Sequence, residues 1–318
     1  MTWRRTVKKT ISISVILTTH NRINDLKKAV ESVFRQTFSD YELLIVNDNS
    51  TDGTKKYIED LSSKNPNVKA ITISAEESRG GNYARNKGVA LSSGEYIAFL
   101  DDDDFWLEKK LEQQFSQIQL NPKVGLIYCG IERRMNGKLL ERHLPSSEDL
   151  GDMSKRIFTH VITVSSAIMI RKSIFEKVGG FDEELTHWQE YDLMIRIAQE
   201  SMIDYVNEIL VIINDSKRDT KKVSNNLQQW LIAVDKINKK YEMQINNLDV
   251  QQKMAKEKYF LTDLAGRYYK LGFLKEHRGV MLRLWKLTRQ KRFFVRYLFN
   301  LNYIQISRLR NLKKRILG

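Results

Sequence analysis

A chain of 318 residues with 42% apolar residues and only 3 prolines has room for one large domain and an appendage, and this composition excludes a largely disordered protein. The single cysteine, Cys129, excludes a disulfide scaffold and a cysteine-rich zinc or iron–sulfur centre, and it fits a reducing compartment. The net charge of +14 belongs to the C-terminal part, because residues 225–318 hold 21 Lys and Arg against 6 Asp and Glu, a net +15 that leaves −1 for residues 1–224.

Strand-like and helix-like runs alternate through the N-terminal part. Strands are expected at about 11–17, 41–46, 68–73 and 96–100, with helices at about 23–36, from 51 onward and at 82–91. Helices between successive strands are typical of βαβ units, so the pattern predicts an α/β fold with a mostly parallel, Rossmann-like sheet flanked by helices. Ligands of such sheets bind beyond the carboxyl ends of the strands. Polar clusters follow three of those ends, at 18–21, 48–50 and 101–104.

The pattern becomes mostly helical near residue 225. Before it, we expect a strand at 124–131, a turn-rich stretch to about 152, a strand at 167–170, a helix at 187–200, and one long strand or a strand pair at 203–213. Beyond it, 264–286 faintly resembles one helix–turn–helix unit of a tetratricopeptide array. We therefore divide the chain into a catalytic part, 1–224, and a helical, basic C-terminal region, 225–318.

No membrane-spanning or secretory segment is expected. No run reaches about 18 apolar residues, the length that a spanning helix needs. The short apolar stretch after the basic N-terminus alternates with Ser and Thr, which indicates a strand and not a signal peptide. We expect a cytoplasmic protein.

Four consecutive aspartates, Asp101 to Asp104, follow the fourth expected strand. Adjacent carboxylates repel one another, and a divalent cation relieves that repulsion. Mg²⁺ and Mn²⁺ prefer oxygen ligands and commonly bridge one or two carboxylates to substrate phosphates. The run therefore predicts a metal-assisted nucleotide site, and the alternative is a solvated acidic turn in which Asp104 caps the next helix.

Five short motifs occur in order between about residues 11 and 200, and together they resemble those of family 2 glycosyltransferases with a GT-A fold. They lie at 14–22, 46–54, 79–88, 94–104, and at 178–182 followed by 189–193. The family's usual Pro-Thr-Tyr-Asn is Thr-Thr-His-Asn here, and Asn47 replaces the first Asp of its Asp-Asp-Gly-Ser motif. The resemblance implies an inverting, metal-dependent transferase of the bacterial surface-polysaccharide type. Its nucleotide-sugar half would span about 11–105, and its acceptor half about 106–224.

The resemblance assigns the nucleobase to the first two polar clusters. Thr18, Thr19 and His20 would line the base, uracil or another, and Asp48 would accept a hydrogen bond from it. Simpler readings stay open, since His20 also suits a polar helix entry and Asp48 suits an Asx turn.

The same resemblance places the diphosphate and a divalent cation, Mn²⁺ or Mg²⁺, at the aspartates. Asp101 and Asp102 would lie near the ribose and diphosphate, and Asp103, with Asp101, would hold the metal, in a register uncertain by one residue. Arg79 and Arg85 would contact the nucleotide or its diphosphate. For Arg85, a structural ion pair is the alternative.

Sugar transfer also needs a base, because the acceptor hydroxyl must lose a proton. Aligning Tyr191-Asp192-Leu193 with the family's pattern puts Glu190 at the base position, a Glu in place of the usual Asp. Residues two apart on a helix do not share a face, so Asp192 is expected to be structural, with Arg196 as its partner. The alternative for Glu190 is a solvated helix residue.

Two further residues are candidates for the acceptor side. Trp188 would form a wall against which a sugar stacks, and plain core packing is its alternative. His160 lies in the acceptor half, where a loop or packing role is the alternative.

Residues 277–318 carry 12 Lys and Arg and no Asp or Glu, interleaved with aromatic residues. They fit a helix pair on an anionic membrane surface, a nucleic-acid patch, or a basic cap on the catalytic part or on a second subunit. The resemblance favours the membrane, since many such transferases use lipid-linked acceptors at the inner membrane face. We therefore expect a nucleotide-sugar donor, a glycan or lipid-linked acceptor and no nucleic acid, and oligomerisation stays open.

The expected function is transfer of one sugar from a nucleoside-diphosphate donor, with a UDP-sugar preferred, in cell-surface polysaccharide synthesis. One alternative is a nucleotidyltransferase, although its usual Gly-rich loop after the first strand is replaced here by Thr-Thr-His-Asn. The other is a non-catalytic basic protein on the same fold that binds a membrane or nucleic acid.

Overall fold

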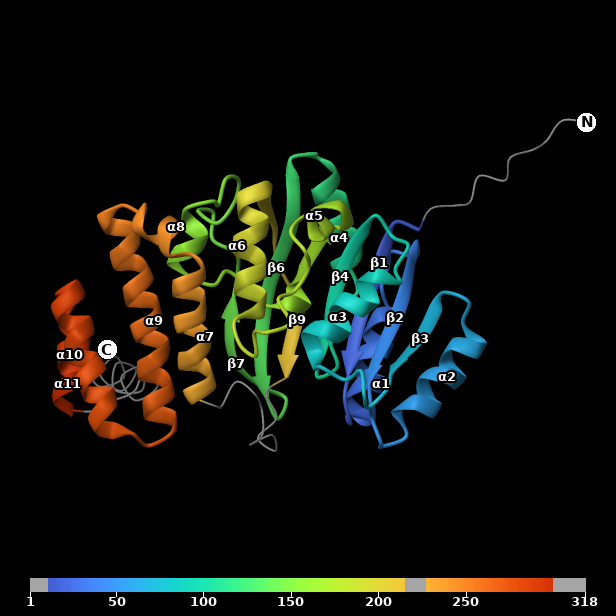
Figure 1. The fold of residues 1–318 in the computed structure, drawn as a ribbon, viewed down its shortest axis with the longest axis horizontal. Helices are drawn as coiled ribbons and strands as arrows, with labels where there is room; N and C mark the ends of the chain where they lie inside the picture. The colour runs from blue at the N-terminus through green and yellow to red at the C-terminus, as the bar shows by residue number, and fades with distance from the viewer. Residues whose placement is uncertain (1–10, 215–226, 300–318) are drawn as a thin grey trace, which may run out of the picture.

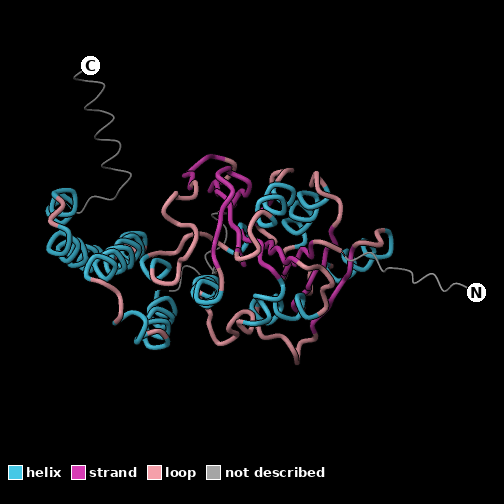
Figure 2. The backbone as a smooth tube through the Cα atoms, turned by 90° about the horizontal axis from the view of Figure 1, so that it is seen from above, coloured by secondary structure: helices cyan, strands magenta, loops and turns pink. Residues whose placement is uncertain are grey.

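A computed structural model describes residues 11–214 and 227–299, and a nine-stranded sheet forms its centre (Figure 1). The strands follow one another in space as β3-β2-β1-β4-β8-β6-β9-β5, with β7 paired to β6. Helices cover both faces of the sheet, and a separate group of helices lies beyond β6 and β7 (Figures 1 and 2). The expected α/β class is confirmed.

The N-terminal part, up to β4, is a parallel sheet of four strands. These are β1 (Ile13–Thr19), β2 (Tyr41–Asp48), β3 (Val68–Ile73) and β4 (Tyr96–Asp101), connected by α1 (Ile23–Phe34), α2 (Thr54–Lys64) and α3 (Gly81–Ala90). Every residue of β1 is buried, as expected for a strand that is covered on both faces. The register sets Thr18 of β1 opposite Val46 of β2 and Asp101 of β4. The carboxyl ends of these three strands are therefore level, and their polar residues meet.

The part of the sheet that follows β4 pairs its strands in both senses. The short strand β8 (Ile168–Arg171) runs antiparallel between β4 and β6 (Val124–Met135), and β5 (Asp104–Trp106) runs antiparallel to β9 (Met202–Asn214). Strands β6 and β9 are parallel, and β9 is one long strand and not a pair. Strand β7 (Lys138–His143) lies in the stretch expected to be turns, and all six of its residues are exposed, so no apolar alternation marked it.

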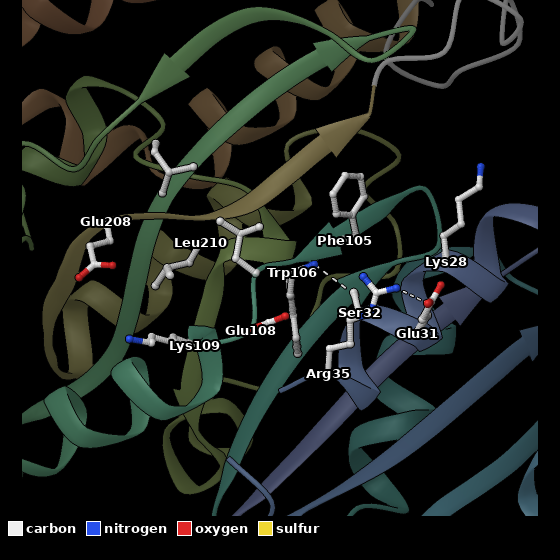
Figure 3. Close-up of a pocket in the computed structure, with 12 residues that line it drawn as sticks. Lys28, Glu31, Ser32, Arg35, Phe105, Trp106, Glu108, Lys109, Glu208 and Leu210 are labelled. Carbon is white, nitrogen blue, oxygen red and sulfur yellow. Dashed lines mark hydrogen bonds and ion pairs between the residues drawn. The ribbon is translucent and has the colours of Figure 1, made fainter. Parts of the chain in front are cut away.

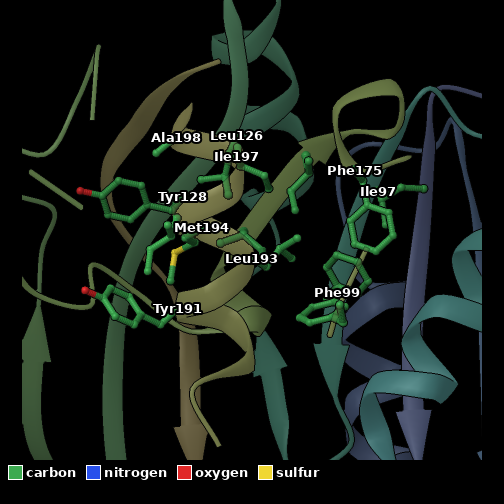
Figure 4. Packing of buried hydrophobic residues seen from close by; sticks show 14 of the residues in the cluster. Ile97, Phe99, Leu126, Tyr128, Phe175, Tyr191, Leu193, Met194, Ile197 and Ala198 are labelled. Atoms are coloured by element: carbon green, nitrogen blue, oxygen red, sulfur yellow. The ribbon is translucent and has the colours of Figure 1, made fainter. Parts of the chain in front are cut away.

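Two apolar layers, one on each face of the sheet, form the core. One layer contains Phe99 of β4, Phe175 of α5 (Lys172–Lys177), and Leu193 and Met194 of α6 (Gln189–Glu200) (Figure 4). The other packs α1 and α4 (Lys110–Gln119) onto the opposite face. Helix α6 is thus fixed by its apolar side, and its first turn points to the carboxyl ends of the parallel strands.

Residues 227–299 of the C-terminal region form five helices. They are α7 (Leu227–Lys240), α8 (Glu242–Asn246), α9 (Val250–Lys270), α10 (Leu274–Thr288) and α11 (Lys291–Phe299). Ile237, Tyr241 and Leu248 belong to the same apolar layer as α6, so this region packs on the catalytic part. A third apolar cluster joins α9, α10 and α11. The expected boundary at residue 224 lies outside the described residues.

None of the helices in residues 11–214 and 227–299 combines the length and the apolar character that crossing a bilayer requires.

Candidate active site

A cavity of about 440 Å³ opens at the level carboxyl ends of β1, β2 and β4. The nine residues that the sequence assigned to the nucleotide sugar or the metal all line it. They are Thr18, Thr19, His20, Asp48, Arg79, Arg85, Asp101, Asp102 and Asp103. Strand register explains the convergence, because each cluster ends a strand that stops at the same edge. We call this space the aspartate cavity.

The four aspartates have different surroundings. Asp101 pairs with Arg85, whose Nη2 lies 2.5 Å from Asp101 Oδ1, and it accepts a hydrogen bond from Ser165 Oγ at 3.2 Å. Asp104 is buried and accepts a 2.6 Å hydrogen bond from Ser166 Oγ, so it holds the loop after β4 in place. Asp103 lines the aspartate cavity, and its side chain is 22% exposed.

Arg22, which the sequence did not single out, links two of these aspartates. Its Nη1 lies 3.1 Å from Asp102 Oδ1 and 3.3 Å from Asp103 Oδ2. Thr19 Oγ1 donates to the other oxygen of Asp102 at 2.7 Å. Burial raises the pKa of Asp102 to about 6, although the charge of Arg22 and the bond from Thr19 favour the ionised form. The only signal for Arg22 was its place at the end of the first motif.

His20 and Asp48 both line the aspartate cavity and are joined by a hydrogen bond. His20 Nδ1 donates to the carbonyl oxygen of Asp48 at 2.5 Å, and the Asn21 amide lies 2.9 Å from His20 Nε2, so the ring is held from both sides. Asp48 is only 7% exposed, and its Oδ1 has no hydrogen-bond partner among the described residues. A buried acceptor without a donor costs free energy, so this oxygen is suited to receive a donor from a ligand.

The N-terminus of α3 lies at the aspartate cavity. Gly80 and Gly81 line the cavity, and Gly80 has a φ of 88°, which favours glycine. Arg79 also lines the cavity, with its guanidinium 5.2 Å from the centroid of the Tyr83 ring. Helix N-termini favour anions through their free N–H groups and the helix dipole.

Glu190 lies in the first turn of α6, close to Arg85 and Asp101. Burial raises the pKa of Glu190, the charge of Arg85 opposes that rise, and the charge of Asp101 adds to it. The Ser165 hydroxyl, which contacts Asp101, also interacts with Glu190. The neighbouring Gln189 lines the aspartate cavity and donates to Glu190 Oε1 at 3.1 Å. Glu190 itself is not among the residues that line the cavity.

Asp192 has the structural role expected of it. Arg196 Nη2 lies 2.6 Å from Asp192 Oδ2, and Lys240 Nζ and the Tyr241 hydroxyl each lie 2.7 Å from Oδ1. The carboxylate is fully buried, and these partners tie α6 to α7.

The two acceptor candidates lie outside the aspartate cavity. Trp188 stacks on Phe260 of α9, with ring centroids 5.1 Å apart, and packs against Trp230 of α7. This contact favours the packing role for Trp188. His160 Nε2 lies 3.0 Å from Asp149 Oδ2 and lines a different cavity. An acceptor role for either residue stays a prediction.

Another cavity, of about 570 Å³, lies between α1, β5 and residues 208–210 of β9 (Figure 3). Its wall includes Phe105, Trp106 and Leu210, and the Trp106 backbone N–H donates to Ser32 Oγ at 3.1 Å. It contains none of the residues that the sequence assigned to the site.

A cation would need ligands beyond those that the protein offers. Within residues 11–214 and 227–299, no group of three or more His, Cys, Asp or Glu side chains is arranged to hold a metal. Mg²⁺ is usually bound by one or two carboxylates together with substrate phosphates. Asp101 and Asp103 fit that arrangement, in which the nucleotide completes the site.

Comparison with known proteins gives one consistent answer. The family model described as "Glycosyl transferase family 2" matches residues 14–179. An uncharacterized glycosyltransferase of Methanocaldococcus jannaschii is 32% identical over 211 residues, which cover 65% of this chain and 72% of the relative. The Escherichia coli enzyme named "UDP-Glc:alpha-D-GlcNAc-diphosphoundecaprenol beta-1,3-glucosyltransferase WfgD" is 25% identical over 228 residues, 70% of this chain and 85% of that protein.

Solved structures agree on the fold. Residues 1–349 of S. aureus TarS in complex with UDP-GlcNAc match 89% of this chain and 82% of that chain, with a TM-score of 0.59 and 18% identity. A mannosyltransferase from Pyrobaculum calidifontis in complex with GDP-Man and Mn²⁺ matches 91% of this chain and 88% of that chain, with a TM-score of 0.53 and 16% identity. Since the family model covers more than half of the chain, and the sheet carries its motifs at one edge, this protein belongs to glycosyl transferase family 2 and is a glycosyltransferase with a GT-A fold.

Proposed function

We propose that this glycosyltransferase moves a sugar, with inversion and with the help of a divalent cation, from a UDP-sugar to a lipid-linked glycan acceptor. The observation that carries the proposal is the aspartate cavity. It gathers a buried unpartnered acceptor, a helix N-terminus and a carboxylate cluster, and Glu190 lies beside that cluster.

The base-binding part of the donor site would be formed by His20 and Asp48. The free Oδ1 of Asp48 is an acceptor for an N–H group of the base, and a pyrimidine such as uracil presents one. Thr18 and Thr19 line the same side. The complex of TarS with UDP-GlcNAc supports a uridine nucleotide for a chain of this fold.

The diphosphate would lie between the N-terminus of α3 and the aspartates. Asp101 and Asp103 would hold the Mn²⁺ or Mg²⁺, which supplies Lewis-acid stabilisation of the charge that develops on the leaving diphosphate. Arg79, at the rim, would add a positive charge there. The Mn²⁺ in the similar mannosyltransferase supports this reading.

Glu190 would take the proton from the acceptor hydroxyl. Its raised pKa makes it a stronger base than an exposed carboxylate, and Arg85 keeps the ionised form accessible. Attack from the side opposite the diphosphate inverts the anomeric centre. Arg85 would bind no substrate atom in this scheme, because it pairs with Asp101 and faces Glu190.

The acceptor would be a glycan on a lipid carrier, as the name of the WfgD relative states for that enzyme. The basic C-terminal helices would then hold the enzyme at the inner face of the cell membrane as a peripheral protein. Sugar transfer accounts for the family match better than nucleotidyl transfer or a non-catalytic binding role.

A donor screen tests the proposal. Purified full-length protein is incubated with a panel of UDP-, GDP- and dTDP-sugars, with and without Mn²⁺, and the released nucleotide is measured. Metal-dependent release of UDP from one UDP-sugar is expected. Release that is equal with and without metal, or release from a GDP- or dTDP-sugar alone, would contradict the proposal.

A further inference from the structure

A third cavity, of about 770 Å³, lies between the loop that leads to the short 3₁₀ helix at Arg156–Thr159 and the helices α9 and α11. It shares no lining residue with the aspartate cavity. Its size falls within the range of about 300–1,000 Å³ that is usual for small-molecule sites. We call it the arginine cavity, because Arg156, Arg292 and Arg296 line it.

The charges of the arginine cavity are unevenly compensated. Arg156 is neutralised by Glu148 and Asp149, at 2.6 and 2.7 Å. Lys258 and Arg292, in contrast, have no ion pair with any carboxylate of residues 11–214 and 227–299. Arg292 instead lies over the Phe293 ring, 4.8 Å from its centroid. One further carboxylate lines the cavity, that of Asp249, whose Oδ1 accepts the Gln252 backbone N–H at the start of α9. Two cations without an ion-pair partner among the described residues, against this one carboxylate, leave an excess of positive charge, which favours an anionic ligand.

Polar neutral groups complete this wall. Gln251 and Gln252 from the first turn of α9 line the same cavity, as does Thr262 about three turns further along the helix. The Thr262 hydroxyl already donates to the Lys258 carbonyl oxygen at 2.7 Å, but the two glutamine amides, with Lys and Arg, can donate hydrogen bonds to phosphate oxygens. The ligand chemistry that fits best is therefore a phosphate or diphosphate.

A short segment connects the arginine cavity to the catalytic residues. His160 lines the arginine cavity, and Ser165, five residues later, contacts both Asp101 and Glu190. Even a fully extended chain of this length spans no more than about 18 Å. A ligand with its reacting hydroxyl near Glu190 can therefore place a second group in the arginine cavity through one or a few sugar units.

Exposed apolar side chains lie next in sequence to residues that line the arginine cavity. Val250 precedes Gln251 on α9 and is 74% exposed, and Val295 lies between Arg292 and Arg296 on α11 and is 40% exposed. A cationic wall with an apolar border suits a ligand that is itself anionic at one point and apolar next to it. A glycan attached through a diphosphate to a polyprenyl chain has this pattern.

We propose that the arginine cavity is the acceptor's diphosphate subsite, in which Lys258 and Arg292 bind the diphosphate of a polyprenyl-linked glycan while its sugar reaches Glu190. This assignment rests on the proposed function. It explains why the C-terminal helices pack against the catalytic part next to the loop 148–160.

Calorimetry with farnesyl diphosphate, below its micelle-forming concentration and with UDP and Mg²⁺ saturating, tests the assignment on the full chain. The nucleotide blocks the aspartate cavity, so binding there does not interfere. Farnesyl diphosphate should bind the wild type, inorganic pyrophosphate should bind more weakly, and farnesol should not bind. The double variant Lys258→Gln/Arg292→Gln should bind farnesyl diphosphate about ten- to a hundredfold more weakly, since it loses two charge-assisted contacts.

A matched control removes the same charge elsewhere. Lys275→Gln/Lys286→Gln lies on the neighbouring α10, where both side chains are exposed, and should bind farnesyl diphosphate as the wild type does. No binding to the wild type, equal binding of pyrophosphate, or equal losses in both double variants would overturn the assignment. A separate titration of the wild type with UDP reports on the donor site. If the proposed function is wrong, UDP does not bind, and this result is distinct from the binding of farnesyl diphosphate.

Discussion

Glu190 differs from an exposed carboxylate in two respects, its burial and its cationic neighbour. Both bear on its use as a base, because burial raises its pKa and Arg85 keeps ionisation possible. Replacing Glu190 by Gln keeps the size and the contact with Gln189 and removes the proton acceptor. Turnover should fall by about 10²- to 10⁴-fold while UDP affinity stays within a few-fold, measured by initial rates and by calorimetry.

The pH profile of the wild type gives an independent check on Glu190. The base must be ionised, so the rate should rise with pH through a pKa above the ordinary 4.5 of a glutamate. That acidic limb should be absent from the residual activity of Glu190→Gln. If the variant loses UDP affinity and keeps its turnover, Glu190 belongs to the donor site and the base is another residue.

Asp103 is the aspartate best placed to meet a cation that arrives with the nucleotide. It lines the aspartate cavity and is partly exposed, whereas Asp104 is buried against Ser166. Asp103→Asn should therefore abolish the Mn²⁺ dependence of UDP binding and leave the melting temperature nearly unchanged. Electron paramagnetic resonance of Mn²⁺ in the presence of UDP measures this directly. Asp25→Asn, on the exposed face of α1, is the matched control, and equal Mn²⁺ binding by both variants would refute the assignment.

Arg79, shortly before α3, and Arg85, within α3, were assigned through the family resemblance. The other residues that the sequence assigned to the aspartate cavity were accessible because each follows a strand whose end the apolar pattern marks. Arg22 was not, since nothing local shows that its guanidinium turns toward aspartates about 80 positions later. The surroundings of Trp188 and His160 could not be predicted from the sequence for a similar reason. Both residues lie beside α9, which is far from them in the chain.

At the scale of elements, α3 is held against the sheet by a close approach at Gly88. A Cβ there would meet Ile16 Cγ2 at 2.6 Å and Val46 Cγ2 at 3.0 Å. Gly88→Ala should thus be destabilising, because overpacking costs about 1–3 kcal/mol. Gly266→Ala in α9, where no atom lies within 4 Å, should instead stabilise by about 0.5–1 kcal/mol through helix propensity. Urea denaturation measures the free energy of unfolding of both variants. A change of the same sign in both would contradict the close approach at Gly88.

Elements in the parallel half were predictable, since their apolar runs and intervening helices are local signals. The antiparallel pairings of β5 and β8 are not local, because β5 meets β9 and β8 lies between two strands that both precede it. Strand β7 is exposed throughout and gives no apolar pattern. The strand pairing in the mixed half of the sheet could therefore be learned only from the structure.

At the scale of the whole molecule, the basic C-terminal region is partly a packing element. Val280, Met281 and Leu284 of α10 are buried against Leu261 and Ala265 of α9. Trp285 contacts Phe294, with centroids 4.9 Å apart. Some of the aromatic side chains between 277 and 299 therefore belong to this packing. Residues 300–318 lie outside the described part of the chain. A cut after Lys275 would remove the partner of α9.

A cut after Gln290 keeps α10 and removes eight Lys and Arg. The shortened chain should bind UDP as the full chain does and should lose most of its binding to anionic vesicles, because each basic residue near such a surface contributes about 1 kcal/mol. Full-length binding should weaken steeply with salt, as co-sedimentation with phosphatidylserine-containing vesicles would show. Equal vesicle binding by both chains would leave the tail without a membrane role.

The claim on which the rest depends is that the aspartate cavity is the donor site. Calorimetric titration of UDP into the full chain with Mn²⁺ tests it, with Asp48→Ala as the variant and Asp25→Ala as the control. Wild type and control should bind UDP at one site, and Asp48→Ala should bind about tenfold or more weakly, because its buried acceptor is lost. A wild type that does not bind UDP, or an Asp48→Ala variant that binds it with unchanged affinity, would contradict the claim.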